Sequence, residues 1–268
     1  MTGTGKGVLL AGLMALGVTA SATANDTRVF TLKHPAPRAG DAFSVEQRTR
    51  LVLQTIGGPE EGRFETSSAF KVRILKNEGA RYLTRVEIAP ASMVTEMHGK
   101  VEKDAAPERR FEGLLDAGEI SLLPAPDGRG EGVGALTAKQ SVKVGETWTC
   151  ERTIPFQKTL SVPIKATYTV ASVEKDPSGH DLLRLVLKSE GCLEVTGTPV
   201  KVTVAGDGEA LVDPEHADRP LQVSISYRFA TSGGEGADTE TRTETTIRTH
   251  ELGVAAETSS VSAQEKSR

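Results

Sequence analysis

The chain of 268 residues is poor in the side chains that most often build reactive or stacking sites. It has two cysteines, one tryptophan, three tyrosines and five histidines, and aromatic residues make up 4% of it. Sugar-binding modules present platforms of tryptophan and tyrosine, so carbohydrate recognition is disfavoured. The histidines lie on separate segments and lack the close spacing of common metal sites; they are His34, His98, His180, His216 and His250.

Signatures of nucleophilic catalysis are missing as well. No G-x-S-x-G is present, and no S-x-x-K falls where a strand would turn into a helix. The 36 acidic residues offer many carboxylate pairs, and the sequence singles out none of them for glycoside hydrolysis. We therefore expect a non-enzymatic protein without a cofactor and assign no catalytic residue.

No basic stripe runs along the chain. The formal net charge is -4, and residues of both signs are interspersed. Nucleic acid and anionic membrane surfaces would each require such a stripe, so both are poor partners. No apolar run reaches the ~20 residues that cross a bilayer as a helix, and we expect no transmembrane segment.

The N-terminus has the pattern of a secretory signal peptide. Lys6 precedes an apolar run from Val8 to Val18, and Ala22-Thr23-Ala24 forms an A-x-A cleavage site before Asn25. We expect residues 1–24 to be removed, which predicts an exported protein that is soluble in the periplasm or outside the cell.

Alternation of apolar and polar residues dominates the remaining chain. In Leu221 to Phe229 every odd position is apolar, and Val162 to Val170 follows the same pattern at even positions. This period of two is typical of half-buried antiparallel strands. The sequence predicts an all-β domain over residues 25–254, an antiparallel meander that forms a strongly curved sheet, a half-barrel or a sandwich. The expected strands are 28–32, 41–56, 65–76, 80–88, 92–103, 109–115, 119–123, 146–153, 160–174, 181–189, 192–196, 200–212, 221–230 and 239–249.

Two segments interrupt the alternation. The stretch from Pro124 to Gly134 is rich in glycine and proline, so 124–138 is either a long surface loop or a boundary between lobes. Residues 255–268 have almost nothing to bury, and we expect a disordered tail.

The stretch VKVGETWTC contains the single tryptophan and one of the cysteines. Gly145 is placed to allow a turn, and the strand that follows puts Trp148 and Cys150 on one face. We interpret Gly145 and Trp148 as structural anchors of that strand.

The two cysteines are Cys150 and Cys192. In an exported chain they predict a disulfide, which would stabilise the fold by roughly 4 kcal/mol for a loop of this length. The alternative is a reduced, buried pair.

An acidic stretch from Ala205 to Asp218 is the best candidate for cation binding. Asp207, Glu209 and Asp213 could offer oxygen ligands to calcium, although their spacing differs from that of an EF-hand loop. The alternative is a solvated strand edge followed by a turn.

The segment Lys139 to Thr149 resembles a "V-x-V-G-[DE]-x-W" phrase of uncharacterised exported bacterial all-β proteins. Supporting matches are Phe111-Glu-Gly and the "G-x-G-x-x-x-x-D" phrase of Gly206 to Asp213. The chain is also similar, at the level of fold, to the half-barrels of periplasmic lipoprotein-carrier and lipid-carrier proteins. This likeness implies one long curved sheet and transfers no functional residue to this chain.

Three functions follow as hypotheses. The first is a binding or carrier module whose apolar sheet face holds a hydrophobic or lipid-like ligand. The second is a structural or protein-interaction module of the cell envelope with a closed core and another envelope protein as partner. The third is a hydrolase of unknown type, which would need a cleft with converging carboxylates or histidines of displaced pKa. The sequence leaves the ligand-binding residues and the oligomeric state open.

Overall fold

The computed structural model describes residues 27–33, 35–115, 140–157, 160–217, 219–234 and 238–252. The predicted signal peptide 1–24, the segment 124–138 and the tail 255–268 lie outside these ranges, as does the expected strand 119–123.

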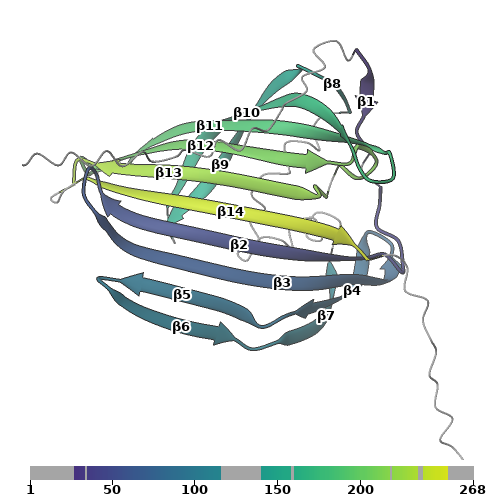
Figure 1. Ribbon diagram of the computed structural model, residues 1–268, viewed down its shortest axis with the longest axis horizontal. Coiled ribbons are helices and arrows are strands. Elements are labelled where there is room, and N and C mark those ends of the chain that lie inside the picture. The colour runs from purple at the N-terminus through teal and green to yellow at the C-terminus, as the bar shows by residue number, and fades with distance from the viewer. Residues whose placement is uncertain are drawn as a thin grey trace, which may run out of the picture.

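Within the described residues the chain is almost entirely β-strand, which confirms the all-β prediction (Figure 1). The helical content there is one 3-10 turn, η1, and no helix is long and apolar enough to cross a membrane. The elements are β1 (Val29–Thr31), β2 (Ala42–Thr55), β3 (Glu60–Glu78), β4 (Arg81–Ile88), β5 (Ala91–Met97), β6 (Lys100–Ala106), β7 (Arg109–Leu115), β8 (Ser141–Lys143), β9 (Thr147–Gln157), β10 (Leu160–Lys175), β11 (Asp181–Glu194), β12 (Lys201–Val212), η1 (Pro214–His216), β13 (Gln222–Ser232) and β14 (Thr239–Glu251).

Two antiparallel meanders join side by side into a 12-stranded sheet. Its order is β6-β5-β3-β2-β14-β13-β12-β11-β10-β9, and β4 pairs with the second half of β3 and with β7. The first meander, β2 to β7, runs from the centre of the sheet to one edge. The second, β9 to β14, runs from the other edge back to the centre, where β14 pairs with β2. Strands β1 and β8 form a separate two-stranded sheet. Among the described strands the two edges do not pair, so the large sheet is open.

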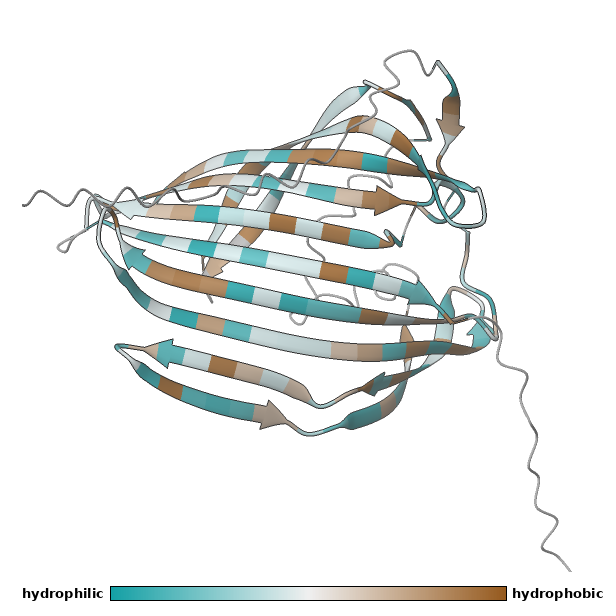
Figure 2. Ribbon diagram, in the orientation of Figure 1, coloured by the Kyte–Doolittle hydropathy of each residue, from teal (hydrophilic) through white to brown (hydrophobic). Residues whose placement is uncertain are grey.

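Hydrophilic and hydrophobic residues alternate along many of the strands (Figure 2), so one face of the sheet is largely polar and charged and the other carries most of the apolar residues. We call the apolar face the inner face. Because the sheet curls toward it, β9 lies over β13 although three strands separate them in the sheet order. The rings of Phe156 on β9 and Phe229 on β13 are 5.2 Å apart. The sheet therefore covers part of its own inner face without the help of helices.

Glycine on the inner face makes room for this curl. Gly206 lies beneath the ring of Tyr227, and a Cβ atom at Gly206 would lie 2.5 Å from Cδ1 of that ring. Gly208 lies on the same face of β12 and is similarly close to the backbone of Ser224. The "G-x-G" phrase of β12 thus serves packing in this fold.

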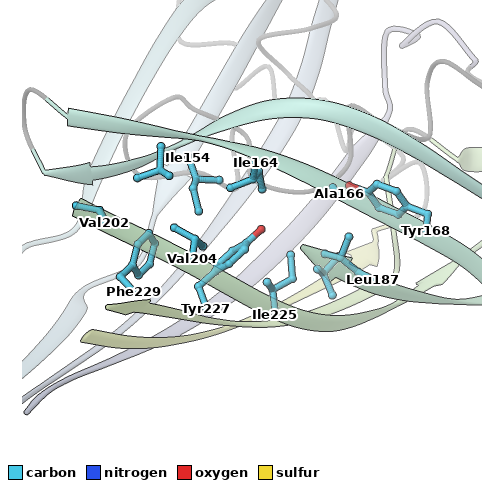
Figure 3. Close-up of a cluster of buried hydrophobic side chains, with 12 residues drawn as sticks. Ile154, Ile164, Ala166, Tyr168, Leu187, Val202, Val204, Ile225, Tyr227 and Phe229 are labelled. Carbon is cyan, nitrogen blue, oxygen red and sulfur yellow. The ribbon is translucent and has the colours of Figure 1, made fainter. Parts of the chain in front are cut away.

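Three clusters of buried apolar side chains form the core. The largest fills the curl between β9 and β13, and it contains Ile154, Val162, Ile164, Ala166, Tyr168, Leu187, Val202, Val204, Val223, Ile225, Tyr227 and Phe229 (Figure 3). A second lies where β1, β8 and η1 meet β10 to β12 and includes Leu32, Val142 and Val212. The third lies at one end of β2, β3 and β4 and includes Phe43, Val72 and Tyr82.

Most strand predictions agree with the structure, with differences at three places. The predicted strand 92–103 is a hairpin, because His98 and Gly99 take positive φ values of 49° and 77° between β5 and β6. Residues 181–189 and 192–196 were predicted as two strands, yet β11 is continuous through Gly191. Strand β8 was not predicted.

Replacing Gly206 with alanine should destabilise the protein by about 1–3 kcal/mol, because the added methyl group forces the Tyr227 ring out of its place. Urea denaturation would measure the change. The matched control is Gly113→Ala on β7, where an added Cβ meets nothing within 4 Å and where alanine should be neutral or slightly stabilising. Equal effects of the two substitutions would contradict this account of the curl.

Candidate functional site on the inner face

The inner face has two parts that differ in exposure. From β9 to β13 it is filled by the largest core cluster. Over β5, and at the ends of β2 and β3 away from the third core cluster, the apolar residues are only half-buried, and Met93 is 42% exposed. An apolar surface that the fold leaves uncovered is a candidate for binding.

The strand register places four of these residues side by side, and Met93 lies opposite Thr66, diagonal to Phe64. Leu51 on β2 lies opposite Phe64 on β3, and Leu53 lies opposite Gly62, which in turn lies opposite Met97 on β5. The Met97 sulfur occupies the space that a side chain at position 62 would need. We call this set the open inner surface; it consists of Leu51, Leu53, Phe64, Met93 and Met97.

Polar side chains border the open inner surface on both sides. On β14 the inner-face residues opposite Leu51 and Leu53 are Thr243 and Thr241. On β6 the inner-face residues are charged, with Glu102 opposite Thr95 and Lys100 opposite Met97. An apolar patch between polar rims is the usual arrangement of a ligand-binding surface.

A group of polar side chains lies within the otherwise apolar cluster between β9 and β13. We call it the polar cluster; it consists of Cys150, Arg152, Tyr168, Ser189 and Tyr227. Cys150, Ser189 and Tyr227 lie on one register row across the sheet. Arg152 Nη1 donates a hydrogen bond of 2.9 Å to the Tyr168 hydroxyl.

Burial affects the ionisation of this pair. Burial raises the pKa of Tyr168 to about 12, against a partial lowering by the nearby Arg152 guanidinium. Burial by itself would lower the pKa of Arg152, but Tyr168, Tyr227 and Cys150 raise it overall. Arg152 is therefore charged and Tyr168 neutral at physiological pH.

The structure places Gly145 in a tight turn and Trp148 against the core. Gly145 has a φ of 80° in the turn between β8 and β9, and its N–H donates to the Val170 carbonyl. The Trp148 ring stacks on Tyr168 at 5.5 Å and packs against the first two core clusters. Trp148 and Cys150 share the inner face with Arg152, as the alternation of this segment indicates.

The predicted disulfide between Cys150 and Cys192 is wrong, since both cysteines are free. Cys150 on β9 lies level with Ser189 on β11, so Cys192 is two strands away and three residues further along. That separation is roughly 14 Å, whereas a disulfide needs Cα atoms within about 7 Å. The side chains also point to opposite faces, Cys150 inward and Cys192 to the exposed outer face.

The three acidic residues considered for calcium are not gathered at one site. Asp207 and Glu209 lie on the outer face of β12, and Glu209 forms an ion pair of 2.6 Å with Arg184. Asp213 caps η1 by accepting a hydrogen bond from the Glu215 N–H. Within the part of the chain that the structure describes, no group of three or more His, Cys, Asp or Glu residues could hold a metal ion.

The alternation of the sequence puts Arg152 on the same face as Trp148 and Cys150 and indicates no role for it. The available signal was its position, because Arg152 stands between Cys150 and Ile154 where the alternation calls for an apolar residue. The open inner surface gave no comparable signal, since its residues alternate like those of any buried strand.

Comparison with models of known protein families gave no match, and comparison with curated proteins gave none. Among solved structures, the transport unit of the autotransporter AIDA-I from Escherichia coli is similar with a TM-score of 0.13 and 7% sequence identity. The similarity covers 81% of this chain and 92% of that one. At this level it supports no conclusion about this protein.

Because the cysteines are unpaired, alkylation of the denatured, unreduced protein should add two alkyl groups, and mass spectrometry would count them. In the native protein Cys192 should react faster than the half-buried Cys150. A reducing agent should leave the melting temperature unchanged. A denatured protein that resists alkylation until it is reduced would show that the disulfide forms.

The raised pKa of Tyr168 predicts a loss of stability in strong alkali. The folded state holds the phenol proton more tightly than the unfolded chain, so the stabilisation is complete below pH 10.0 and is lost as the pH rises toward about 12. The free energy of unfolding should fall by up to roughly 1.4 kcal/mol per pH unit from this group. Tyr168→Phe should remove this part of the slope, whereas Tyr82→Phe should keep it; identical slopes in the two variants would refute the assignment.

Proposed function

We propose that this protein is an exported, non-enzymatic binding or carrier protein that holds a hydrophobic or lipid-like ligand on the open inner surface. The observation that carries the proposal is the half-exposed patch of Leu51, Leu53, Phe64, Met93 and Met97 on the inner face.

The chemistry of the surface favours a flexible alkyl chain over a flat ring system. Two leucines and two methionines provide aliphatic and thioether contacts, and Phe64 is the one aromatic ring in the set. Methionine adapts its shape to irregular partners, which suits ligands with several conformations. Each methylene that leaves water should contribute about 0.8 kcal/mol.

The charges of the outer face support the placement of the ligand on the inner face. On β2, Arg50 lies between Glu65 of β3 and Glu244 of β14, at 3.7 and 3.9 Å. Such exposed pairs contribute little to stability, but they keep this face hydrated. A hydrophobic ligand would therefore bind on the inner face and not on the charged outer face.

Binding of n-alkyl alcohols should tighten roughly tenfold for every two methylenes added between eight and twelve carbons. Displacement of a fluorescent hydrophobic dye would measure it, and native mass spectrometry after gentle purification would reveal a ligand retained from the cell. Leu51→Ser and Phe64→Ser should each weaken binding about tenfold or more.

The matched control is Val52→Ser, which removes an apolar side chain from the outer face of the same strand. Its affinity should equal that of the wild type. If no probe of any length binds, the function proposed here is wrong, and the filled cluster between β9 and β13 would favour the closed structural module instead.

A further inference from the structure

Arg152 is a half-buried arginine on the inner face, where no acidic residue of the described strands lies opposite it. Arg184 pairs with Glu174 and Glu209, and Arg228 pairs with Glu240. Among the described residues no carboxylate lies within ion-pair distance of Arg152, and its hydrogen bond is to the neutral Tyr168 hydroxyl. A half-buried charge without a counter-ion costs free energy that an anion would offset.

Ser189 provides a second and independent observation. Its side chain is 6% exposed, and its hydroxyl has no hydrogen-bond partner in the structure. A buried hydroxyl without a partner costs about 1–3 kcal/mol. Its place inside the largest core cluster, on the row of Cys150 and Tyr227, puts this donor beside the row of Arg152.

The tyrosines complete the surroundings of these two groups. The Tyr227 hydroxyl points across the interior toward β10, and the Tyr168 hydroxyl points toward Ala166 (Figure 3). Tyr168 fixes the Arg152 guanidinium by accepting its hydrogen bond, which makes Tyr168 a positioning residue. A guanidinium held in this way keeps further N–H groups for a second acceptor.

The polar cluster and the open inner surface belong to the same face. The row of Ser189 and Tyr227 continues through Thr243 to Leu51 and Phe64. Ser189 and Leu51 are four strand spacings apart, or roughly 19 Å along the curved sheet, and an alkyl chain on the concave side follows a shorter path.

We propose that the polar cluster binds the anionic head group of a single-chain amphiphile, with Arg152 and Ser189 as donors to the head-group oxygens. The alkyl chain would extend over Thr243 to the open inner surface, so this inference rests on the proposed function. Carboxylate and phosphate head groups share the required chemistry, since a guanidinium fork binds two oxygens of either.

The test uses four probes: dodecanoate, dodecyl phosphate, dodecanol and inorganic phosphate. The wild type should bind the two anionic amphiphiles roughly 10- to 100-fold more tightly than dodecanol, and inorganic phosphate far more weakly than dodecyl phosphate. Arg152→Gln should abolish the preference over dodecanol. Lys165→Gln is the matched control, because it removes the same charge from the outer face of the adjacent strand β10.

Ser189→Ala is a second variant that tests the same site if Arg152→Gln does not fold. Removing an unpartnered hydroxyl should not lower the melting temperature, yet it should weaken binding of both anionic amphiphiles severalfold.

Each contrary result has a distinct meaning. Equal binding of dodecanoate and dodecanol, or a preference that survives Arg152→Gln and Ser189→Ala, would overturn the head-group site and leave the proposed function standing. Inorganic phosphate binding as tightly as dodecyl phosphate would show a site for free anions and overturn the amphiphile. No binding of dodecanol or of either amphiphile would overturn the proposed function and this inference together.

Discussion

The pairing of β14 with β2 is the interaction on which the rest of this structure depends. It runs from Thr239 opposite Thr55 to Glu251 opposite Phe43, and it joins the last strand of the sheet to its first. Without this pairing the chain would form two separate meanders, and β2 in one and β14 in the other would be exposed edge strands. The paired residues are far apart in the sequence, so closing the chain between them costs entropy. The hydrogen bonds and apolar contacts between the two halves must offset that cost. Ile247 on β14 packs against core clusters on both sides of the junction.

The curl of the sheet follows from a second constraint, the lack of helices. A one-sided sheet must bury its apolar face against something. Between β9 and β13 the sheet meets this need by folding over itself, and the glycines of β11 and β12 permit the close approach. Gly191 lies against Ile164 and the backbone of Pro163, and Gly206 lies against Tyr227. At the ends of β2 and β3 away from the third core cluster, Leu51, Leu53 and Phe64 stay half-buried.

The sequence predicted the fold class, most strands and the inner face of each, because a period of two determines which residues face the same way. In Leu221 to Phe229 all five predicted core residues lie on the inner face, and four of them are buried. The disulfide prediction failed because it used loop length and compartment, whereas pairing of cysteines depends on strand order and on the face of each strand. Cys150 and Cys192 differ in both. The hairpin at His98 was missed because a positive φ is uncommon at a histidine, so the residue gave no turn signal in the sequence.

The candidate site depends on a feature that the alternation of the sequence does not reveal, the coverage of the inner face. Period two identifies an inner face but does not say which part of it the fold will cover, because coverage depends on how strongly distant strands curl. Leu51 and Val223 look alike in sequence, yet Leu51 is half-exposed and Val223 is 5% exposed. Arg152 is the converse case, a local exception to the pattern that the sequence displays openly. Exceptions of this kind tend to mark functional positions, because a stabilising core would not retain a charge without a partner. The function proposed above explains the two features together: the open inner surface would contact an alkyl chain, and Arg152, whose one hydrogen bond is to Tyr168, would contact an anion.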